Sequence, residues 1–216
     1  ELYGLDRPLA ERFVRWAGSA ARFDFGRSFR DGEPVLEKIA SRLPVTLAIN
    51  VTALLLTLVL AVVVGVAGAV RQGRWQDHLL MFIVFVAFAM PTFVLAIGAM
   101  AFFGVHLHWF PVSGVTSLDH DLMTGWEKCL DLARHLTLPI AVSVLAPFAG
   151  LARYMRSGMN EVLRQEYIKT AWSKGLAPGV IFYRHALRNA LLPLITILGL
   201  SLPGVLGGSV ILETVF

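Results

Sequence analysis

Long stretches without a charged residue constrain the fold of this chain more than any other feature. No Asp, Glu, Lys, Arg or His occurs between Leu43 and Val70, or between Leu79 and Val105. About 20 apolar residues in a helix cross the hydrocarbon core of a bilayer, so both runs are long enough to span a membrane. Two shorter apolar runs follow. The expected membrane spans are therefore about 43–70, 79–105, 136–153 and 190–212.

The third run is the shortest, and charged residues follow it directly. Its uncharged part extends from Leu136 to Ala152, close to the lower limit for crossing a bilayer. Long cationic side chains can lie along apolar surface and keep their charge at the membrane interface. We therefore expect Arg153 and Arg156 to extend this span toward the membrane surface.

The composition supports an integral membrane protein. Of the 216 residues, 56% are hydrophobic and 16% are charged, whereas about a quarter are charged in a typical soluble domain. The net charge of +4 is expected in loops that face anionic lipid, not on a nucleic-acid-binding surface. The single cysteine, Cys129, excludes an internal disulfide, and no Cys/His cluster suggests a metal site. The predicted fold class is an all-α, polytopic transmembrane helical bundle.

The distribution of charge predicts the orientation in the membrane. Residues 153–189 contain seven Lys and Arg against two Glu, whereas residues 106–135 have a net charge of −2. Positive loops remain on the cytoplasmic side, so 153–189 is expected to be cytoplasmic together with 71–78. Residues 1–42 form an amphipathic segment that is expected on the opposite, external side, although their eight Lys and Arg against seven acids favour neither side.

The expected spans lack the groups that two classes of membrane protein require. Proton- and ion-coupled carriers generally need ionisable residues within the membrane, and an intramembrane hydrolase needs a nucleophile with a base or a metal. The interiors of the four runs contain no ionisable residue, and their hydroxyl groups have no His or Asp nearby to act as a base. Polar residues there could line a translocation pathway or form hydrogen bonds between helices. The candidate pathway residues are Asn50, Thr46, Thr57, Ser143 and Ser201.

The basic loop contains an amphipathic segment. On a helix over 165–176, Ile168, Ala171, Trp172, Gly175 and Leu176 would share one face, at spacings of i, i+3, i+4, i+7 and i+8. Polar residues occupy the other face, and glycine and proline at 175–179 end the helix. Such a helix lies on the lipid surface or docks into a protein, and the pattern alone leaves both open.

The sequence EYIKTAWSKGL, followed by RHALRNALLPLIT, resembles the cytoplasmic signature loop of ABC importer permeases, in the branch that carries peptides and nickel. Gly175 matches the glycine of the general family pattern, Ala171 its second alanine and Leu187 its leucine. The departures are Lys169 for Glu, Thr170 for the first Ala, His185 for Ile and Arg188 for Pro. They are similar to departures usual in the peptide branch. RLPVTL at 42–47, WFPVSG at 109–114 and ETVF at 213–216 extend the resemblance over nearly the whole chain.

This resemblance implies a permease-type bundle whose core is 43–216 and whose cytoplasmic loop, 153–189, forms a coupling helix seated in a groove of an ATPase subunit. It implies a second permease subunit, two cytoplasmic ATPases, a solute-binding protein and a place in the bacterial inner membrane. ATP and Mg would be bound by the partner subunits, with no cofactor in this chain, which has no GxxxxGK[ST] loop. The residues expected to form the coupling loop are Glu166, Tyr167, Lys169, Thr170, Ala171, Trp172, Lys174, Gly175 and Leu176.

The implied activity is import of dipeptides or oligopeptides, in which this chain forms the channel and a partner hydrolyses ATP. Nickel, glutathione or oligosaccharide import by the same mechanism is an alternative, as is a membrane scaffold whose basic loop binds lipid. The importers of this branch have a further span on each side of the region matched here. The chain is therefore expected to be the core of a longer permease.

Overall fold

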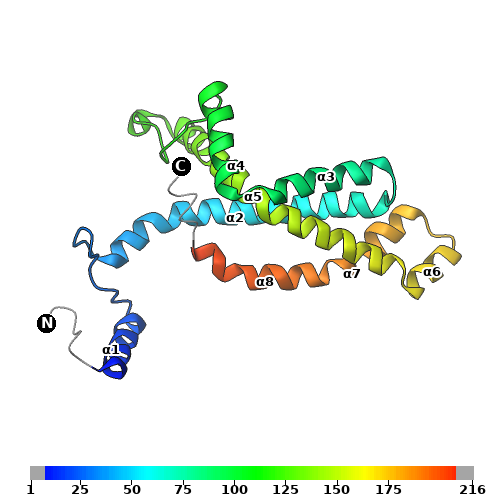
Figure 1. Cartoon of the computed structure of the whole chain (residues 1–216), viewed down its shortest axis with the longest axis horizontal. Helices are drawn as coiled ribbons and strands as arrows, with labels where there is room; N and C mark the ends of the chain where they lie inside the picture. The colour runs from blue at the N-terminus through cyan, green and yellow to red at the C-terminus, as the bar shows by residue number, and fades with distance from the viewer. Residues whose placement is uncertain (1–7, 208–216) are drawn as a thin grey trace. The chain divides into compact units, whose positions relative to one another are not determined.

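The computed structural model describes residues 8–207, which fold as parts of two compact units, residues 1–46 and 47–216. Both units are helical (Figure 1). The helix α2, Val35–Val70, begins in the first unit and continues through the second. Each unit is described below by itself.

The first unit contains the amphipathic helix α1, Leu9–Ala21. Leu9, Phe13 and Trp16 are spaced at i, i+4 and i+7, so they share one face, and the rings of Phe13 and Trp16 lie 5.9 Å apart. All residues of α1 are exposed or half-buried.

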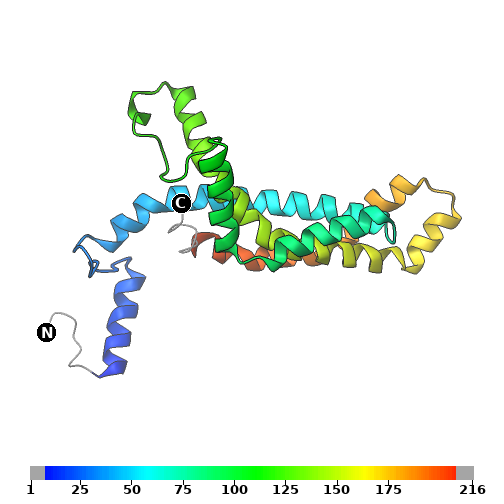
Figure 2. The ribbon, with the colours of Figure 1, turned by 45° about the horizontal axis from the view of Figure 1, so that its top comes forward.

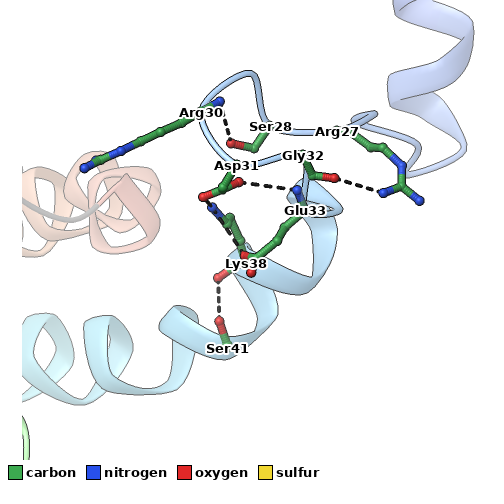
Figure 3. A network of polar contacts seen from close by, with 8 residues as sticks. All are labelled: Arg27, Ser28, Arg30, Asp31, Gly32, Glu33, Lys38 and Ser41. Carbon is green, nitrogen blue, oxygen red and sulfur yellow. Dashed lines mark hydrogen bonds and ion pairs between the residues drawn. The ribbon is translucent and has the colours of Figure 1, made fainter.

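A polar turn connects α1 to α2 (Figure 3). Arg27 pairs with Pro34 through an isolated antiparallel bridge, and its Nη1 donates to the main-chain oxygen of Gly32 at 2.9 Å. Lys38 forms ion pairs with Asp31 and Glu33. The main chain of Gly32 has a φ of +73°, a left-handed conformation that glycine adopts without steric strain. The turn therefore fixes the start of α2 by local contacts.

In the second unit, α2 presents a stripe of small residues to its neighbours. The buried residues of α2 are Ala53, Thr57, Ala61, Gly65, Val66, Gly68 and Ala69. Most of them recur every four residues and so lie on one helix face. A Cβ added at Gly65 would lie 2.6 Å from Cβ of Met155, so the backbones of α2 and the helix that carries Met155 approach closely there.

The expected span 79–105 is not one helix. It is divided into α3, Trp75–Ala89, α4, Thr92–Ala99, and a π-helix, η1, Met100–His106. Met90 is extended, with φ −89° and ψ 130°. The residue before a proline is pushed out of the helical region, so Pro91 explains the break.

The expected span 136–153 lies within a much longer helix, α5, Gly125–Leu163. Both the main-chain N–H and the hydroxyl of Thr124 donate to the Glu127 carboxylate at 2.8 Å, which caps the start of α5. The helix bends by 44° at Pro147, where proline removes a main-chain donor. Figure 2 shows α5 running beside α3 and α8, both of which it contacts.

The remaining chain forms the loop and the last helices. The elements are η2, His120–Leu122, α6, Glu166–Ser173, the π-helix η3, Val180–Ala186, α7, Leu187–Ala190, and α8, Leu192–Gly207. The expected span 190–212 corresponds to α8 up to Gly207, and its last residues lie outside the described part. The segment Val180–Ala190 meets α8 at an angle of 41°.

Within residues 8–207, α2 is the one helix long and apolar enough to cross a membrane. Two bent pairs, the halves of α5 and 180–190 with α8, raise that number to three if each pair is one span. The remaining apolar helices, in 75–86 and 92–106, are shorter. The assignment of four spans and of residues 1–42 and 43–216 as domains therefore stays a prediction. In Figures 1 and 2, the α2–α3 turn and α6 lie at one end of the second unit, and the loop before α5 lies at the other.

Candidate functional site

Helix α6 is the amphipathic helix predicted in the basic loop, and it is shorter than 165–176. It ends at Ser173 because Gly175 adopts a φ of +73°. The N–H of Gly175 donates to the oxygen of Trp172 at 2.9 Å, and the N–H of Leu176 donates to that of Ala171 at 3.4 Å. These two bonds and the left-handed glycine form a Schellman motif, which stops the helix sharply.

Part of the apolar face of α6 is used inside the chain. Ile168 is fully buried and Ala171 is 7% exposed. Both belong to an apolar cluster that joins α2, α5, η3, α7 and α8. Its buried members are Val66, Ala69, Met155, Met159, Ile168, Ala171, Ile181, Ala186, Ala190 and Leu194. The loop is therefore anchored to the helical bundle by core packing.

The tip of α6 remains accessible. Trp172 is 45% exposed, and its ring meets that of Phe182 edge-on at 6.1 Å. Tyr167 is 44% exposed, and Lys174 and Leu176 are exposed. Trp172 thus has one side packed on η3 and the other side free to contact another molecule.

The polar residues of α6 mostly contact one another. Lys169 forms an ion pair with Glu166 at 2.7 Å, and both side chains are well exposed, so the pair contributes little to stability. The Thr170 hydroxyl donates to the main-chain oxygen of Glu166 at 3.0 Å. Of the two lysines in the predicted coupling loop, Lys169 and Lys174, the first is engaged in this pair. No side-chain bond to Lys174 is seen within residues 8–207.

Asn189 contributes to the loop in a way that the sequence did not indicate. Its Nδ2 donates to the hydroxyl of Tyr167 at 2.8 Å, across 22 positions of the chain. It also donates to the main-chain oxygen of His185 at 3.3 Å. Asn189 therefore connects α7 to α6 beside the buried cluster.

The candidate pathway residues differ in their hydrogen bonds. Asn50 donates to the main-chain oxygen of Val205 at 2.8 Å, which connects α2 to α8. Ser201 is exposed, and its hydroxyl donates to Ile197 of its own helix at 2.8 Å. The buried hydroxyls of Thr57 and Ser143 have no hydrogen-bond partner among the described residues. Thr46 ends the first unit.

A second polar centre, which the sequence did not indicate, lies in the loop before α5. Asp131 is 7% exposed. Its carboxylate accepts hydrogen bonds from the N–H of Ser117 at 3.0 Å and from its hydroxyl at 2.5 Å, and lies 2.7 Å from Nδ1 of His120. Nδ1 of His135 lies 2.9 Å from the main-chain oxygen of Asp131. The bonds from Ser117, more than any other contact, lower the pKa of Asp131 to about 2.

Comparison with known proteins assigns this arrangement to a family. Residues 58–216 match the family described as "Binding-protein-dependent transport system inner membrane component". The whole chain is 40% identical to the oligopeptide transport system permease protein AppB of Bacillus subtilis, of which it covers 67%. It is 36% identical, over 99% of its length, to the di/tripeptide transport system permease protein DppB of Pseudomonas aeruginosa, again covering 67% of that protein. The resemblance predicted from the cytoplasmic loop is confirmed, and the chain belongs to the family of inner-membrane components of binding-protein-dependent transport systems.

Proposed function

We propose that this chain is the channel-forming permease subunit of an ATP-driven importer that moves dipeptides or oligopeptides into the cytoplasm. The proposal rests on one observation: one face of α6 is buried in the bundle, and the tip of the helix is exposed. Ile168 and Ala171 fix the helix to the bundle core, while Trp172 and Lys174 remain accessible at its tip. A helix held in this way can transmit force from a partner to the bundle.

The energy source lies outside this chain in our proposal. Two cytoplasmic ATPase subunits bind ATP and Mg, and this chain needs no cofactor of its own. Closure of the ATPase pair pushes α6, and the packed cluster passes the displacement to α5 and α2. Tightly packed interfaces have a few discrete arrangements and do not deform continuously. A displacement of α6 can therefore change which side of the pathway is open.

The coupling surface comprises the exposed residues of the predicted loop. Trp172 supplies the apolar anchor, because large aromatic residues dominate the binding energy of protein interfaces. Lys174 supplies positive charge, and the glycine turn at Gly175 allows close approach of the partner's backbone. Ala171 and Ile168 act indirectly, by holding the helix. Glu166, Tyr167, Lys169, Thr170 and Leu176 complete the proposed surface.

Peptides are the proposed substrates because the names of the relatives specify them. These names are oligopeptide, di/tripeptide and dipeptide transport system permease proteins. Nickel complexes, glutathione and oligosaccharides remain the alternatives predicted from the family. Asn50, Thr46, Thr57, Ser143 and Ser201 are the proposed pathway residues, and Thr57 and Ser143 carry buried hydroxyls.

The remaining partners follow from the same proposal. A second, related permease subunit completes the pathway, and a periplasmic or lipid-anchored solute-binding protein delivers the substrate. Residues 1–42 lie on the periplasmic side, near the binding protein. The loop centred on Asp131 lies on that side as well.

Disulfide crosslinking in membranes tests the coupling role. Cys129, which is exposed, is replaced by Ser, and a single cysteine is introduced by Ser173→Cys. Ser173 is exposed on α6, next to Trp172. A second cysteine is placed in the surface groove of the ATPase subunit. We expect a crosslink whose yield changes when ATP is added.

A matched control uses Arg71→Cys in the same Cys129→Ser background, because Arg71 is exposed but lies outside the predicted loop. It should give little crosslink. Absence of any Ser173→Cys crosslink, together with protection of α6 by anionic vesicles, would instead identify a lipid-binding scaffold.

A further inference from the structure

Asp77 and Arg156 form an ion pair that the sequence did not predict, between a buried carboxylate and a partly exposed guanidinium. Asp77 lies in the first turn of α3 and is 1% exposed. Nε of Arg156 donates to its Oδ1 at 2.8 Å, and Nη2 donates to its Oδ2 at 2.6 Å. Arg156 thus binds this carboxylate through two nitrogens of its guanidinium, the strongest and most directional form of ion pair.

The pair also fixes the turn between α2 and α3. The N–H of Gly73 donates to Oδ2 of Asp77 at 3.1 Å. Burial by itself raises the pKa of Asp77, but the hydrogen bonds from Arg156 and Gly73 outweigh it, so the pKa lies below its ordinary value of 3.8. The carboxylate is therefore charged at neutral pH and holds the turn to α5.

Helix α2 leaves room for the ion pair at Gly68. A Cβ added at Gly68 of α2 would lie 3.2 Å from Cδ of Arg156 and 3.3 Å from Oδ1 of Asp77. Glycine thus lets α2 lie directly against the ion pair. Helices α2, α3 and α5 meet there through one charged contact between residues that are 79 positions apart.

The pair is adjacent to the anchor of α6. Met155, the residue before Arg156, is 1% exposed and belongs to the same apolar cluster as Ile168. The α2–α3 turn and α6 also lie at the same end of the second unit in Figures 1 and 2. Packing therefore connects α6 to Met155, and the ion pair connects the next residue, Arg156, to Asp77.

We propose that the Asp77–Arg156 pair is a positioning element of energy coupling, which makes the α2–α3 turn move with α5 and α6 as one body. The inference rests on the proposed function. A buried ion pair often adds little stability compared with apolar residues of similar size, but its directional geometry defines how elements dock. The pair would thus determine how the helices move more than whether they fold.

The test uses the full-length permease assembled with its partner permease, the ATPase subunits and the binding protein in proteoliposomes. The variants are Asp77→Asn, Arg156→Gln, the double variant and Arg156→Lys. Arg156→Gln leaves the buried carboxylate of Asp77 without its partner, so we expect a low yield of folded permease. Asp77→Asn leaves a guanidinium that is partly exposed, so its yield should fall less. The double variant removes both charges, and Arg156→Lys keeps the charge without the two-pronged contact, so both should be recovered in good yield.

The decisive measurement is peptide taken up per ATP hydrolysed. We expect uptake per ATP to fall about fivefold or more in the double variant, and by a smaller factor in Arg156→Lys. A fivefold change is at the lower end of the coupling usually found between distant sites. Arg71→Gln, which removes an exposed positive charge next to the same turn, should leave uptake per ATP unchanged. The ATP-dependent crosslink from Ser173→Cys should persist, because α6 still meets the ATPase.

The alternative outcomes separate the two hypotheses. Wild-type uptake per ATP in both the double variant and Arg156→Lys would show that the pair is only structural, and would leave the proposed function intact. No ATP-driven uptake by the wild-type transporter, together with no crosslink from Ser173→Cys in the Cys129→Ser background, would overturn both.

Discussion

The loop that carries α6 and the loop before α5 are held in the fold by different forces. The α6 loop is anchored by apolar side chains, with Ile168 and Ile181 fully buried in the cluster. The loop before α5 is gathered around one carboxylate, that of Asp131, which contacts Ser117 and His120. Apolar packing is insensitive to pH, whereas a carboxylate holds its donors only while it is charged.

The difference matches what the two loops are proposed to do. A coupling loop must carry force in each transport cycle, and dense packing transmits displacement because a core has few voids. The loop before α5, which we propose to lie on the other side of the membrane, has only to keep a defined shape. The following changes weaken one loop and spare the other.

The largest loss of stability is expected for Ile168→Ala. It removes a side chain that is 0% exposed, and such substitutions typically cost about 2–5 kcal/mol because a cavity remains. We expect a lower unfolding temperature of the purified permease and faster proteolysis after Lys174. Val180→Ala, at a position 38% exposed, is the matched control and should change neither measurement. Equal effects of the two substitutions would mean that the cluster does not anchor α6.

A smaller loss is expected for Asp131→Asn. The amide cannot accept hydrogen bonds as a carboxylate does, and its NH₂ group faces the donors of Ser117. Proteolysis within 106–124 should become faster, while proteolysis at the α6 loop stays unchanged. Asp119→Asn, an exposed acid in the same loop, serves as the control. Faster cleavage at both loops would show that they are not independent.

The same carboxylate predicts a dependence on acid. The pKa of Asp131 is lowered from 3.8 to about 2. A lowered pKa stabilises the fold above the unfolded value, so this contribution is full above about pH 4 and is lost as the pH falls through about 2. Pepsin, which is active in this range, should cut the loop before α5 increasingly between pH 4 and pH 2 in the wild type. In Asp131→Asn, cleavage should be faster throughout and depend less on pH.

The sequence predicts local features of both loops better than it predicts their distant contacts. The end of α6 at Gly175 and the cap of α5 at Thr124 follow from residue types at fixed spacings. The run 79–105 was expected to be one span because it is uncharged throughout. Pro91 divides it, since proline forces the residue before it out of the helical conformation. The pairs Asp77–Arg156 and Tyr167–Asn189 join residues far apart in the chain, and no periodic pattern reports such contacts.

The smallest loss of stability is expected at Gly175, where backbone strain and interface charge can be separated. A Cβ there meets no atom within 4 Å, so the cost of a side chain comes from the φ of +73° alone. A left-handed conformation costs most residues about 1–2 kcal/mol, and Asn and Asp less. Gly175→Asn and Gly175→Asp should therefore lower the unfolding temperature slightly and to the same extent.

Transport should distinguish the two Gly175 variants, since only aspartate adds a negative charge beside Lys174, at the tip proposed to enter the ATPase groove. We expect Gly175→Asp to insert normally and lose ATP-driven uptake, whereas Gly175→Asn retains a substantial part of it. Equal loss in both would assign the defect to the shape of the turn, and normal uptake by Gly175→Asp would argue that this tip does not meet the ATPase. Because the α6 core is untouched in both, either result would also separate the role of the tip from that of its anchor at Ile168.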